Sequence, residues 1–415
     1  MKRIFALLLT VALALSLMPA AFAASELNGQ MSGELNVYYW EEYMNPIMDK
    51  IIAQFNETWP DVKVNTTQIP FDQYFVKLQT SLPAGMGPDI FLCNVCNVAY
   101  YIDNELIMDL TDLMAESGID LNNYVTSSVE MYTFDGRTYG FPQFIDCAGL
   151  VYNKRLFDEA GVAYPTADWT WDDLLAAAQA LTKEGQYGIA VSSNYYPGYR
   201  QFTLQAGGST YDEDLNPSVN TPEYVKGVEF CLDLMYKYNV APSAAEMEET
   251  GLDQMFSSGK VAMMYAGSWS PVTYYESLGD DLGCSVIPKD EKQLALSHAC
   301  AWVLNSRSSN QTAAWEFTKL LAGEDAALAF ASQVIPSYLG TSGQWVSQLP
   351  EAVNLQAFID ILSNGMAVPF PACGVHSAAL DDILTEEINN IWYQSKTIEQ
   401  GLADAQAAME AELAE

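Results

Sequence analysis

The N-terminal third of the chain alternates between short apolar strands and amphipathic helices. Residues 34–40 and 62–69 predict two strands, and residues 88–92 begin a third. Between them, apolar side chains recur at helical spacing over 47–59, and residues 72–82 predict a second helix. The order strand-helix-strand-helix-strand with short connections predicts an α/β fold, with a mostly parallel sheet covered by helices on both faces.

The middle of the chain predicts a second α/β unit. Thr170 is a good N-cap residue, with Asp173 three positions later, and an alanine- and leucine-rich helix follows. Strands are expected at 187–191 and 260–265, and a further helix at 222–238. No low-complexity linker separates the two units, so we expect strand-like crossings to join two lobes at a hinge.

The last part of the chain shows the same mixture of predicted strands and helices. Residues 301–304 predict a strand, and residues 311–321 predict a helix. Amphipathic helices with acidic outer faces are expected at 378–393 and 398–413. A length of 415 residues is long for a single hydrophobic core and also favours two domains.

The first residues predict an export signal. Lys2 and Arg3 precede an apolar stretch at 4–18, and the Ala-Phe-Ala of residues 21–23 offers a small-x-small cleavage site. We therefore expect residues 1–23 to be a secretory signal peptide. No cysteine at the cleavage point indicates a lipid anchor, and no later segment is long enough to span a membrane. The mature protein is expected to be periplasmic, extracellular or associated with the cell surface.

The charge balance narrows the choice of partner. The formal net charge is −35 at pH 7, and only 18 residues are Lys or Arg. A negative field of this strength repels nucleic acid and anionic lipid, so neither is expected as a partner. A solvated, aggregation-resistant surface is the simplest reading of the acidic excess.

Seven cysteines are many for an exported chain, and the odd number leaves at least one thiol without a partner in the same chain. Cys284 and Cys300 lie in two apolar runs that could be neighbouring strands. This pair is therefore the first candidate for a disulfide.

Cys93 and Cys96 follow a predicted strand and precede a helical stretch, which is the context of a thiol redox motif. The only histidines are His298 and His376, so no nearby set completes a zinc shell. A local disulfide or two buried thiols is the preferred interpretation, and no metal or cofactor is expected.

An acidic run at 212–223 matches several positions of a calcium loop. Pro217, however, occupies the position that needs glycine. A polar turn followed by a helix, with Thr221 as N-cap and Pro222 in the first turn, is the simpler account.

Three stretches carry a resemblance to a known family. LQTSLPAGMGPDIF at 78–91 combines a helix, a glycine turn and a Pro-Asp-Ile strand, and DGRTYGFPQFIDCAGLVYNKRLFDEAGV at 135–162 includes a Tyr-Asn-Lys element. FSSGKVAMMYAGSW at 256–269 ends on a tryptophan after a glycine. In these blocks the chain resembles the extracellular solute-binding proteins of ABC importers, in the sugar-binding group that includes maltodextrin-binding proteins.

The resemblance implies a two-lobe periplasmic-binding-protein-like fold of type II, with discontinuous lobes joined by a hinge and a ligand cleft between them. It assigns 32–142 and 296–336 to lobe 1, and 148–292 and 340–413 to lobe 2. The chain then crosses between lobes near 142–147, 284–296 and 336–339. It also implies a monomeric, non-enzymatic receptor that closes on a carbohydrate and delivers it to ABC permease subunits.

Candidate ligand-binding residues lie at strand ends, where loops of open α/β lobes converge. A neutral sugar offers CH-rich faces and hydroxyl groups, which aromatic rings, amides and carboxylates complement. Trp302 fits the core as well as the cleft, and the tyrosines at 195 and 196 also fit a packed surface loop. The candidates are Tyr39, Trp40, Glu41, Asn94, Asn97, Asp146, Asn194, Tyr195, Tyr196, Trp269, Trp302 and Tyr338.

Two other functions remain open at this point. A secreted glycoside hydrolase needs two carboxyl groups at a defined separation, and Glu41 and Asp146 are the candidates for such a pair. The family resemblance argues against that function. A binding protein for a different neutral solute is the other alternative.

Overall fold

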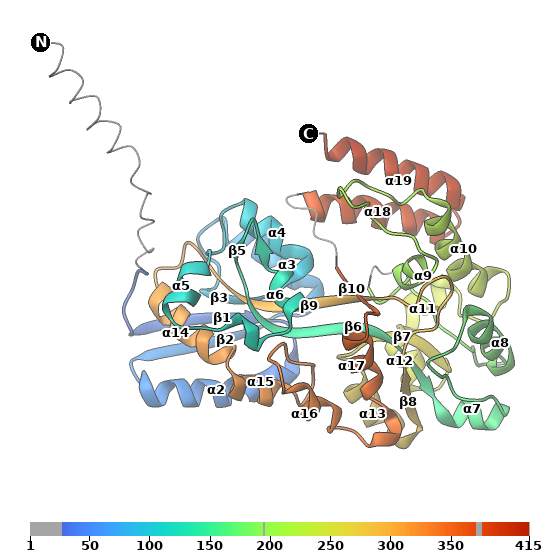
Figure 1. The fold of residues 1–415 in the computed structure, drawn as a ribbon, viewed down its shortest axis with the longest axis horizontal. Helices are drawn as coiled ribbons and strands as arrows, with labels where there is room; N and C mark the ends of the chain where they lie inside the picture. The colour runs from blue at the N-terminus through green and yellow to red at the C-terminus, as the bar shows by residue number, and fades with distance from the viewer. Residues whose placement is uncertain (1–26, 194–195, 371–375, 415) are drawn as a thin grey trace, which may run out of the picture.

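The computed structural model shows an elongated molecule in which long strands join two lobes (Figure 1). The structure describes residues 27–193, 196–370 and 376–414. The predicted signal peptide, residues 1–23, therefore lies outside the described residues, as do Asn194 and Tyr195. In the described part of the chain, no helix combines the length and the apolar character that a membrane span requires.

One eight-stranded sheet runs through both lobes. Its main path has the order β2-β1-β3-β9-β6-β7, with β10 paired to β9 and β8 paired to β6. The first three strands are parallel, as the β-α-β-α-β pattern predicted. β9 runs antiparallel to β3 and β6 and parallel to β10, and β6 runs antiparallel to β7 and β8. The sheet is therefore mixed, and the prediction of a mostly parallel sheet is wrong. The strands are β1 (Gly33–Tyr39), β2 (Val62–Gln68), β3 (Ile90–Asn94), β6 (Phe141–Asn153), β7 (Met263–Gly267), β8 (Leu282–Ser285), β9 (Ala295–Leu304) and β10 (Ala367–Pro369).

Strands β6 and β9 carry the chain between the lobes. The first half of β6 pairs with β9, and its second half pairs with β7 and β8 in the other lobe. A third crossing lies alongside, because Ile145 N donates to Ile335 O at 3.0 Å and Ser337 N donates to Gln143 O at 2.9 Å. Every residue of β6 and β9 is buried.

Lobe 1 contains the chain before β6 and the segment that follows β9. Its apolar residues form two clusters on the two faces of the sheet. Helices cover both faces, and a short hairpin leads into β6. These elements are η1 (Glu42–Met44), α2 (Asn45–Thr58), α3 (Phe71–Ser81), α4 (Val95–Asp103), α5 (Thr111–Glu116), η2 (Leu121–Asn123), α6 (Thr126–Glu130), β4 (Thr133–Phe134), β5 (Arg137–Thr138), α14 (Gln311–Leu321) and α15 (Glu324–Phe330).

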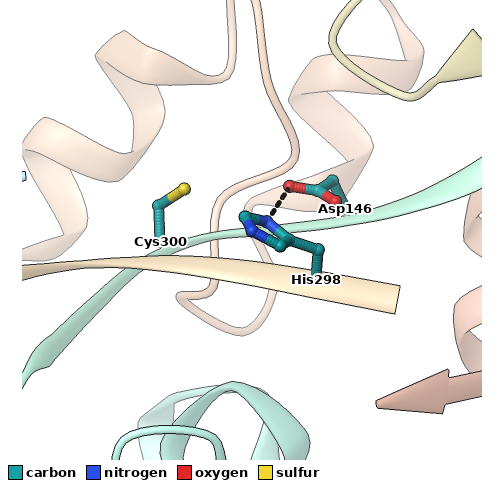
Figure 2. A group of neighbouring side chains, drawn as sticks. All are labelled: Asp146, His298 and Cys300. Atoms are coloured by element: carbon teal, nitrogen blue, oxygen red, sulfur yellow. Dashed lines mark hydrogen bonds and ion pairs between the residues drawn. The ribbon is translucent and has the colours of Figure 1, made fainter. Parts of the chain in front are cut away.

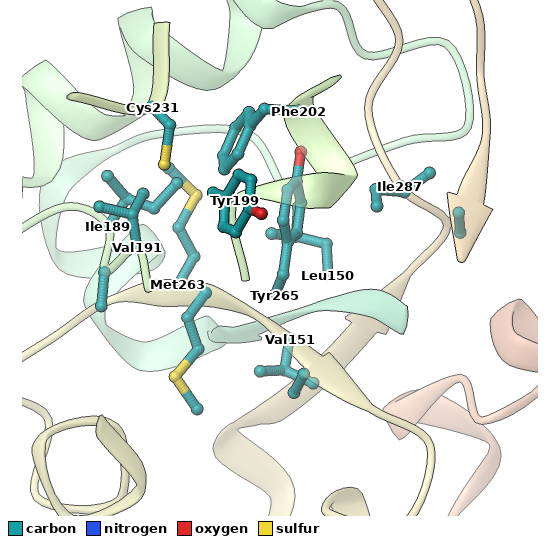
Figure 3. Close-up of a cluster of buried hydrophobic side chains, with 14 of the residues drawn as sticks. Leu150, Val151, Ile189, Val191, Tyr199, Phe202, Cys231, Met263, Tyr265 and Ile287 are labelled. Carbon is teal, nitrogen blue, oxygen red and sulfur yellow. The ribbon is translucent and has the colours of Figure 1, made fainter. Parts of the chain in front are cut away.

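Lobe 2 holds the largest hydrophobic cluster, built around the second half of β6 and around β7. Figure 3 shows Leu150 and Val151 of β6 with Met263 and Tyr265 of β7 among side chains from the surrounding loops and helices. The elements are α7 (Lys154–Ala160), α8 (Trp171–Leu181), α9 (Arg200–Gln205), α10 (Pro222–Tyr236), α11 (Ala244–Thr250), α12 (Leu252–Ser257), α13 (Pro271–Leu278), η3 (Gly279–Asp281), α16 (Ser342–Val346), η4 (Glu351–Val353), α17 (Gln356–Ser363), α18 (Ser377–Trp392) and α19 (Ile398–Glu412).

Local signals in the sequence located several helix ends correctly. Thr170 and Asp173 form the predicted capping box at the start of α8, and Thr221 caps α10. The helix predicted at 311–321 is observed with the same bounds. The expected strand at 187–191 is reduced to isolated bridges, from Tyr187 to Val261 and from Ala190 to Met264 of β7, so this part of the prediction is wrong.

The acidic run at 212–223 forms the expected polar turn. Asp212 Oδ1 accepts hydrogen bonds from the backbone N–H groups of Asp214 and Asn216, both at 2.9 Å. The carboxylate therefore stabilises its own turn.

The predicted Cys284–Cys300 disulfide is wrong. Both thiols are free and buried. Cys284 on β8 lies opposite Val151, whereas Cys300 on β9 lies opposite Phe144. Seven residues along β6 correspond to about 23 Å, far beyond the reach of a disulfide, which needs Cα atoms within about 7 Å.

The local disulfide between Cys93 and Cys96 is also absent, since both thiols are free. Cys93 is buried in a lobe 1 cluster, and its Sγ lies 3.3 Å from the carbonyl oxygen of Asn94. Cys96 is half-buried in the first turn of α4. The two thiols therefore have different surroundings.

Candidate ligand-binding site

The candidate site begins where β6 and β9 cross from one lobe to the other. The register of these strands places Asp146 directly opposite His298. Asp146 Oδ2 lies 3.2 Å from His298 Nδ1 (Figure 2). Asp146 Oδ1 accepts a hydrogen bond of 2.8 Å from the Tyr196 hydroxyl. The carboxylate thus joins both crossing strands to a loop of lobe 2. We call this group of three residues the cleft floor, after the ligand cleft that the family resemblance implies between the lobes.

The electrostatics of the cleft floor favour positive charge on His298. Burial by itself lowers the pKa of a histidine, because it penalises the charged ring. The adjacent Asp146 carboxylate outweighs burial and raises the pKa of His298 well above its usual value. The cleft floor therefore holds two buried, hydrogen-bonded side chains on facing strands.

Aromatic rings pack around Asp146 and His298. The Tyr196 ring stacks on the His298 ring, with 5.7 Å between centroids and 20° between planes. The Trp269 ring lies 5.5 Å from Tyr196, tilted by 42°. Phe370 approaches the edge of the His298 ring at 6.3 Å. Ring faces and a carboxylate are thus side by side, a combination that suits the CH faces and hydroxyls of a sugar.

The position of Trp269 depends on a glycine at the end of β7. An ideal Cβ built on Gly267 would lie 2.1 Å from both Cη2 and Cζ3 of Trp269. Any side chain at Gly267 would therefore occupy the space that the indole fills. The Gly-Ser-Trp sequence at the end of an apolar strand lets the ring fold back over the strand end, where it remains partly exposed.

A cavity of about 500 Å³ lies beside Trp269, within the usual range of about 300–1,000 Å³ for ligand pockets. All of its lining residues belong to lobe 2. Its wall includes Trp269, Tyr393, Glu248 and Asp253, and the Tyr393 hydroxyl donates to Glu248 Oε2 at 3.2 Å. Trp269 thus lines this cavity and also contacts Tyr196 of the cleft floor.

Lobe 1 supplies further polar and aromatic groups after β1 and β3. Trp40 packs edge-on against Tyr74, with ring centroids 5.2 Å apart, and remains partly exposed. Burial raises the pKa of the next residue, Glu41, although a hydrogen bond with Trp40 opposes the shift. Asn97 Nδ2 donates to Asn94 Oδ1 at 2.7 Å.

Two of the sequence candidates, Tyr39 and Trp302, are buried in the core. Tyr39 is buried beneath α2 with its hydroxyl donating to Asn45, and Trp302 is fully buried with its indole N–H donating to Gln143. Both belong to the lobe 1 core, so their assignment to the ligand site is corrected. Tyr338 packs edge-on against Tyr124 on the third crossing.

Sequence reasoning missed His298, which lies in the cleft floor, and Cys300, which lies two residues farther along β9. These residues are about two hundred positions from β3 and α4 in the sequence, and only the pairing of β3 with β9 brings them near this part of lobe 1. Period-two alternation could have placed His298 and Cys300 on one face, but only the strand pairing shows what they face.

Relatives of known binding specificity match much of the chain. The galactooligosaccharide-binding protein of Bacillus subtilis is 26% identical over 335 residues, covering 77% of this chain and 76% of that protein. The arabinooligosaccharide-binding protein of Halalkalibacterium halodurans is 25% identical over 277 residues. That match covers 63% of this chain and 60% of the relative's length.

Solved structures agree with the fold over nearly the whole chain. An ABC substrate-binding protein from Listeria monocytogenes in complex with cycloalternan has a TM-score of 0.86 at 24% identity, covering 92% of this chain and 99% of that one. Maltose-bound MalE3 of T. maritima has a TM-score of 0.79 at 21% identity, with 91% and 99% covered. The family model for bacterial extracellular solute-binding proteins matches residues 41–328. This chain therefore belongs to the bacterial extracellular solute-binding protein family.

Proposed function

We propose that this protein captures a neutral mono- or oligosaccharide between its lobes and delivers it to the permease of an ABC importer. One observation carries the proposal: Tyr196 and Trp269 present aromatic rings beside the Asp146 carboxylate at the crossing of the lobes. Rings and acceptors in this arrangement match the two kinds of surface that a sugar offers. The similarity to galactooligosaccharide-binding and arabinooligosaccharide-binding proteins supports the same class of ligand.

Capture works by hinge closure. Three segments cross between the lobes, and the cleft floor lies on two of them. A sugar resting on Trp269 of lobe 2 gains contacts with Trp40, Glu41 and Asn97 of lobe 1 when the lobes approach. These added contacts stabilise the closed form, which the permease then recognises. The protein acts as an exported monomer, and binding breaks no covalent bond.

The glycoside hydrolase is the rival function. Hydrolysis needs one carboxyl group as a proton donor and a second as nucleophile or base. Glu41, with its raised pKa, fits the first role. Asp146 fits the second poorly, because its two oxygens already contact Tyr196 and His298. The binding test below therefore includes an assay for cleavage.

Calorimetric titration of residues 24–415 with a panel of neutral mono- and oligosaccharides tests the proposal. Saturable heat with an intact sugar supports it, and micromolar affinity corresponds to about −8 kcal/mol. Trp269→Ala weakens this binding, whereas Tyr164→Ala, at an exposed aromatic in another part of lobe 2, leaves it unchanged. Cleaved sugar in the recovered mixture favours the hydrolase. Absence of heat with every sugar refutes carbohydrate as the ligand class.

A further inference from the structure

An exposed aromatic ring begins helix α3 of lobe 1. Phe71 is the first residue of this helix, and its exposed fraction is 55%. Its ring packs edge-on against Trp40, with 5.6 Å between centroids, and against Phe75 at the same distance. Large apolar side chains are usually buried, so an exposed ring that two other rings support is a candidate contact surface. We call these three residues the lobe 1 platform.

The helix that carries the platform is fixed to the sheet. The hydroxyl of the buried Tyr74 lies 2.9 Å from the carbonyl oxygens of both Tyr38 in β1 and Leu92 in β3, and it donates to this pair. Gln68 Nε2, at the end of β2, donates to the carbonyl oxygen of Trp40 at 2.7 Å. The rings are therefore held in place before a ligand arrives, which reduces the entropy lost on binding.

The strand register places the platform on the side of lobe 1 that leads to lobe 2. The last residue of β3, Asn94, lies opposite Cys300, which is two residues from His298 of the cleft floor. β1 is parallel to β3, and β2 is parallel to β1, so all three strands end at the same edge of the sheet. Trp40 follows β1 directly, and Phe71 follows β2 by three residues. The platform and the cleft floor therefore share this edge.

The platform and the cleft floor are too far apart for a single sugar ring to contact both. The order of the sheet places β3 between β1 and β9, and β6 lies beyond β9. Neighbouring strands are about 4.8 Å apart, so β1 lies about 10–15 Å from the pair of strands that carries the cleft floor. One pyranose ring is shorter than this span. A ligand that contacts both surfaces therefore contains several sugar units joined in a chain.

We propose that Phe71, supported by Trp40 and Phe75, stacks on the CH face of a sugar unit distant from the cleft floor, so that the ligand is an oligosaccharide rather than a monosaccharide. This inference rests on the proposed carbohydrate binding. Ring faces suit the CH-rich face of a sugar. Glu41 and Asp72, which follow Trp40 and Phe71 in the sequence, add carboxylates that accept hydrogen bonds from hydroxyl groups. These two acids also favour a neutral sugar unit over an acidic one.

Calorimetric titration with sugars of increasing length tests the platform. The probes are glucose, maltose, maltotriose and maltotetraose, together with galactose and β-galactooligosaccharides of the same lengths. We expect the affinity of the wild-type protein to rise with chain length. Phe71→Ala should lower the affinity for the longest sugar that binds about 5–20-fold, and that for the shortest by less than about twofold. Phe71→Tyr keeps the ring and should bind as wild type. Val76→Ala, at an exposed apolar residue of the same helix, is the matched control and should also bind as wild type.

Comparison with Trp269→Ala separates a distant contact from a general effect. Trp269→Ala should weaken the binding of short and long sugars alike, whereas Phe71→Ala should act on the longer ones. Unchanged affinity in Phe71→Ala, or equal losses for short and long sugars, would overturn the inference. If thermal unfolding shows that Phe71→Ala does not fold, Phe71→Leu tests the loss of the ring with less loss of apolar surface. A wild-type protein that binds only monosaccharides overturns this inference alone, whereas one that binds none of the sugars refutes the proposed function as well.

Discussion

Gly267→Ala should weaken sugar binding without removing any group that touches the sugar. The added methyl group would lie 2.1 Å from two atoms of the Trp269 ring. Ordinary carbon contacts are about 3.5–4.0 Å, so the indole must move by roughly 1.5 Å. The backbone at Gly267 does not have the positive φ angle that requires glycine, so alanine fits the strand itself.

The magnitude follows from the contacts of the displaced ring. An aromatic stacking contact contributes about 0.5–1.5 kcal/mol beyond the burial of apolar area. With partial loss of that area as well, we expect a cost of about 1–2 kcal/mol, which is a Kd about 5–30-fold higher. Calorimetry with the tightest sugar of the panel measures this change. Gly343→Ala, where a methyl group meets no neighbour, is the control and binds as wild type.

A double-mutant cycle shows whether the effect acts through the ring. In Trp269→Ala protein the methyl group at position 267 has nothing to displace, so Gly267→Ala should then cost almost nothing. Additive losses in the double mutant would refute this reasoning, because the methyl group would be acting elsewhere. Wild-type affinity in Gly267→Ala, together with weak binding in Trp269→Ala, would show that the ring binds sugar from a different position.

The remaining predictions concern stability and redox state. Thr170→Ala removes the capping box of α8 and should lower the free energy of unfolding by about 1 kcal/mol in chemical denaturation. Burial alone raises the pKa of Asp109, but hydrogen bonds from Thr111 and the Arg137 guanidinium outweigh it and lower this pKa. Folding therefore favours the ionised form of Asp109. The stabilisation is fully present above the pKa that Asp109 has in the unfolded chain, and it is lost as the pH falls through the lower pKa that Asp109 has in the folded protein. Asp109→Asn should destabilise the protein by about 1 kcal/mol at pH 7 and by progressively less below about pH 4; equal losses at pH 7 and pH 3 would contradict the assignment. Thiol titration of denatured protein purified without oxidant should find the six described cysteines reduced, and a lower number would show a disulfide that the structure lacks.

Local rules predicted much of the fold because the relevant interactions are close in sequence. The capping box at Thr170 and the N-cap at Thr221 involve residues three apart, and both are observed. Tyr39 could also have been placed correctly. Leu35, Val37 and Tyr39 alternate along β1 and all three are buried, so the period of two already assigned Tyr39 to the core.

The remaining features could not be predicted because they depend on pairing between strands that are far apart in the sequence. All ten residues of β9 are buried, so the strand has no polar face that would show which side meets the cleft. Trp302 and His298 lie on the same face by alternation, yet one is in the lobe 1 core and the other at the cleft floor. The difference lies in their neighbours, because Trp302 packs within a lobe 1 cluster whereas His298 contacts Asp146 and Tyr196. The prediction of a Cys284–Cys300 disulfide failed for the same reason, because β8 and β9 pair with distant parts of β6.

The position of the cleft floor sets a requirement on the proposed closure. Groups on the crossing strands lie close to the hinge, so their distance to a bound sugar changes least as the lobes move. The free energy that favours the closed form must then come from lobe 1. Moving an equilibrium from 1:99 to 99:1 takes about 5.5 kcal/mol of differential binding. Trp40 alone supplies about 0.5–1.5 kcal/mol by stacking. Hydrogen bonds to a charged group contribute about 1.5–3 kcal/mol each, so a complete shift requires Glu41 and neighbouring polar groups as well as the ring.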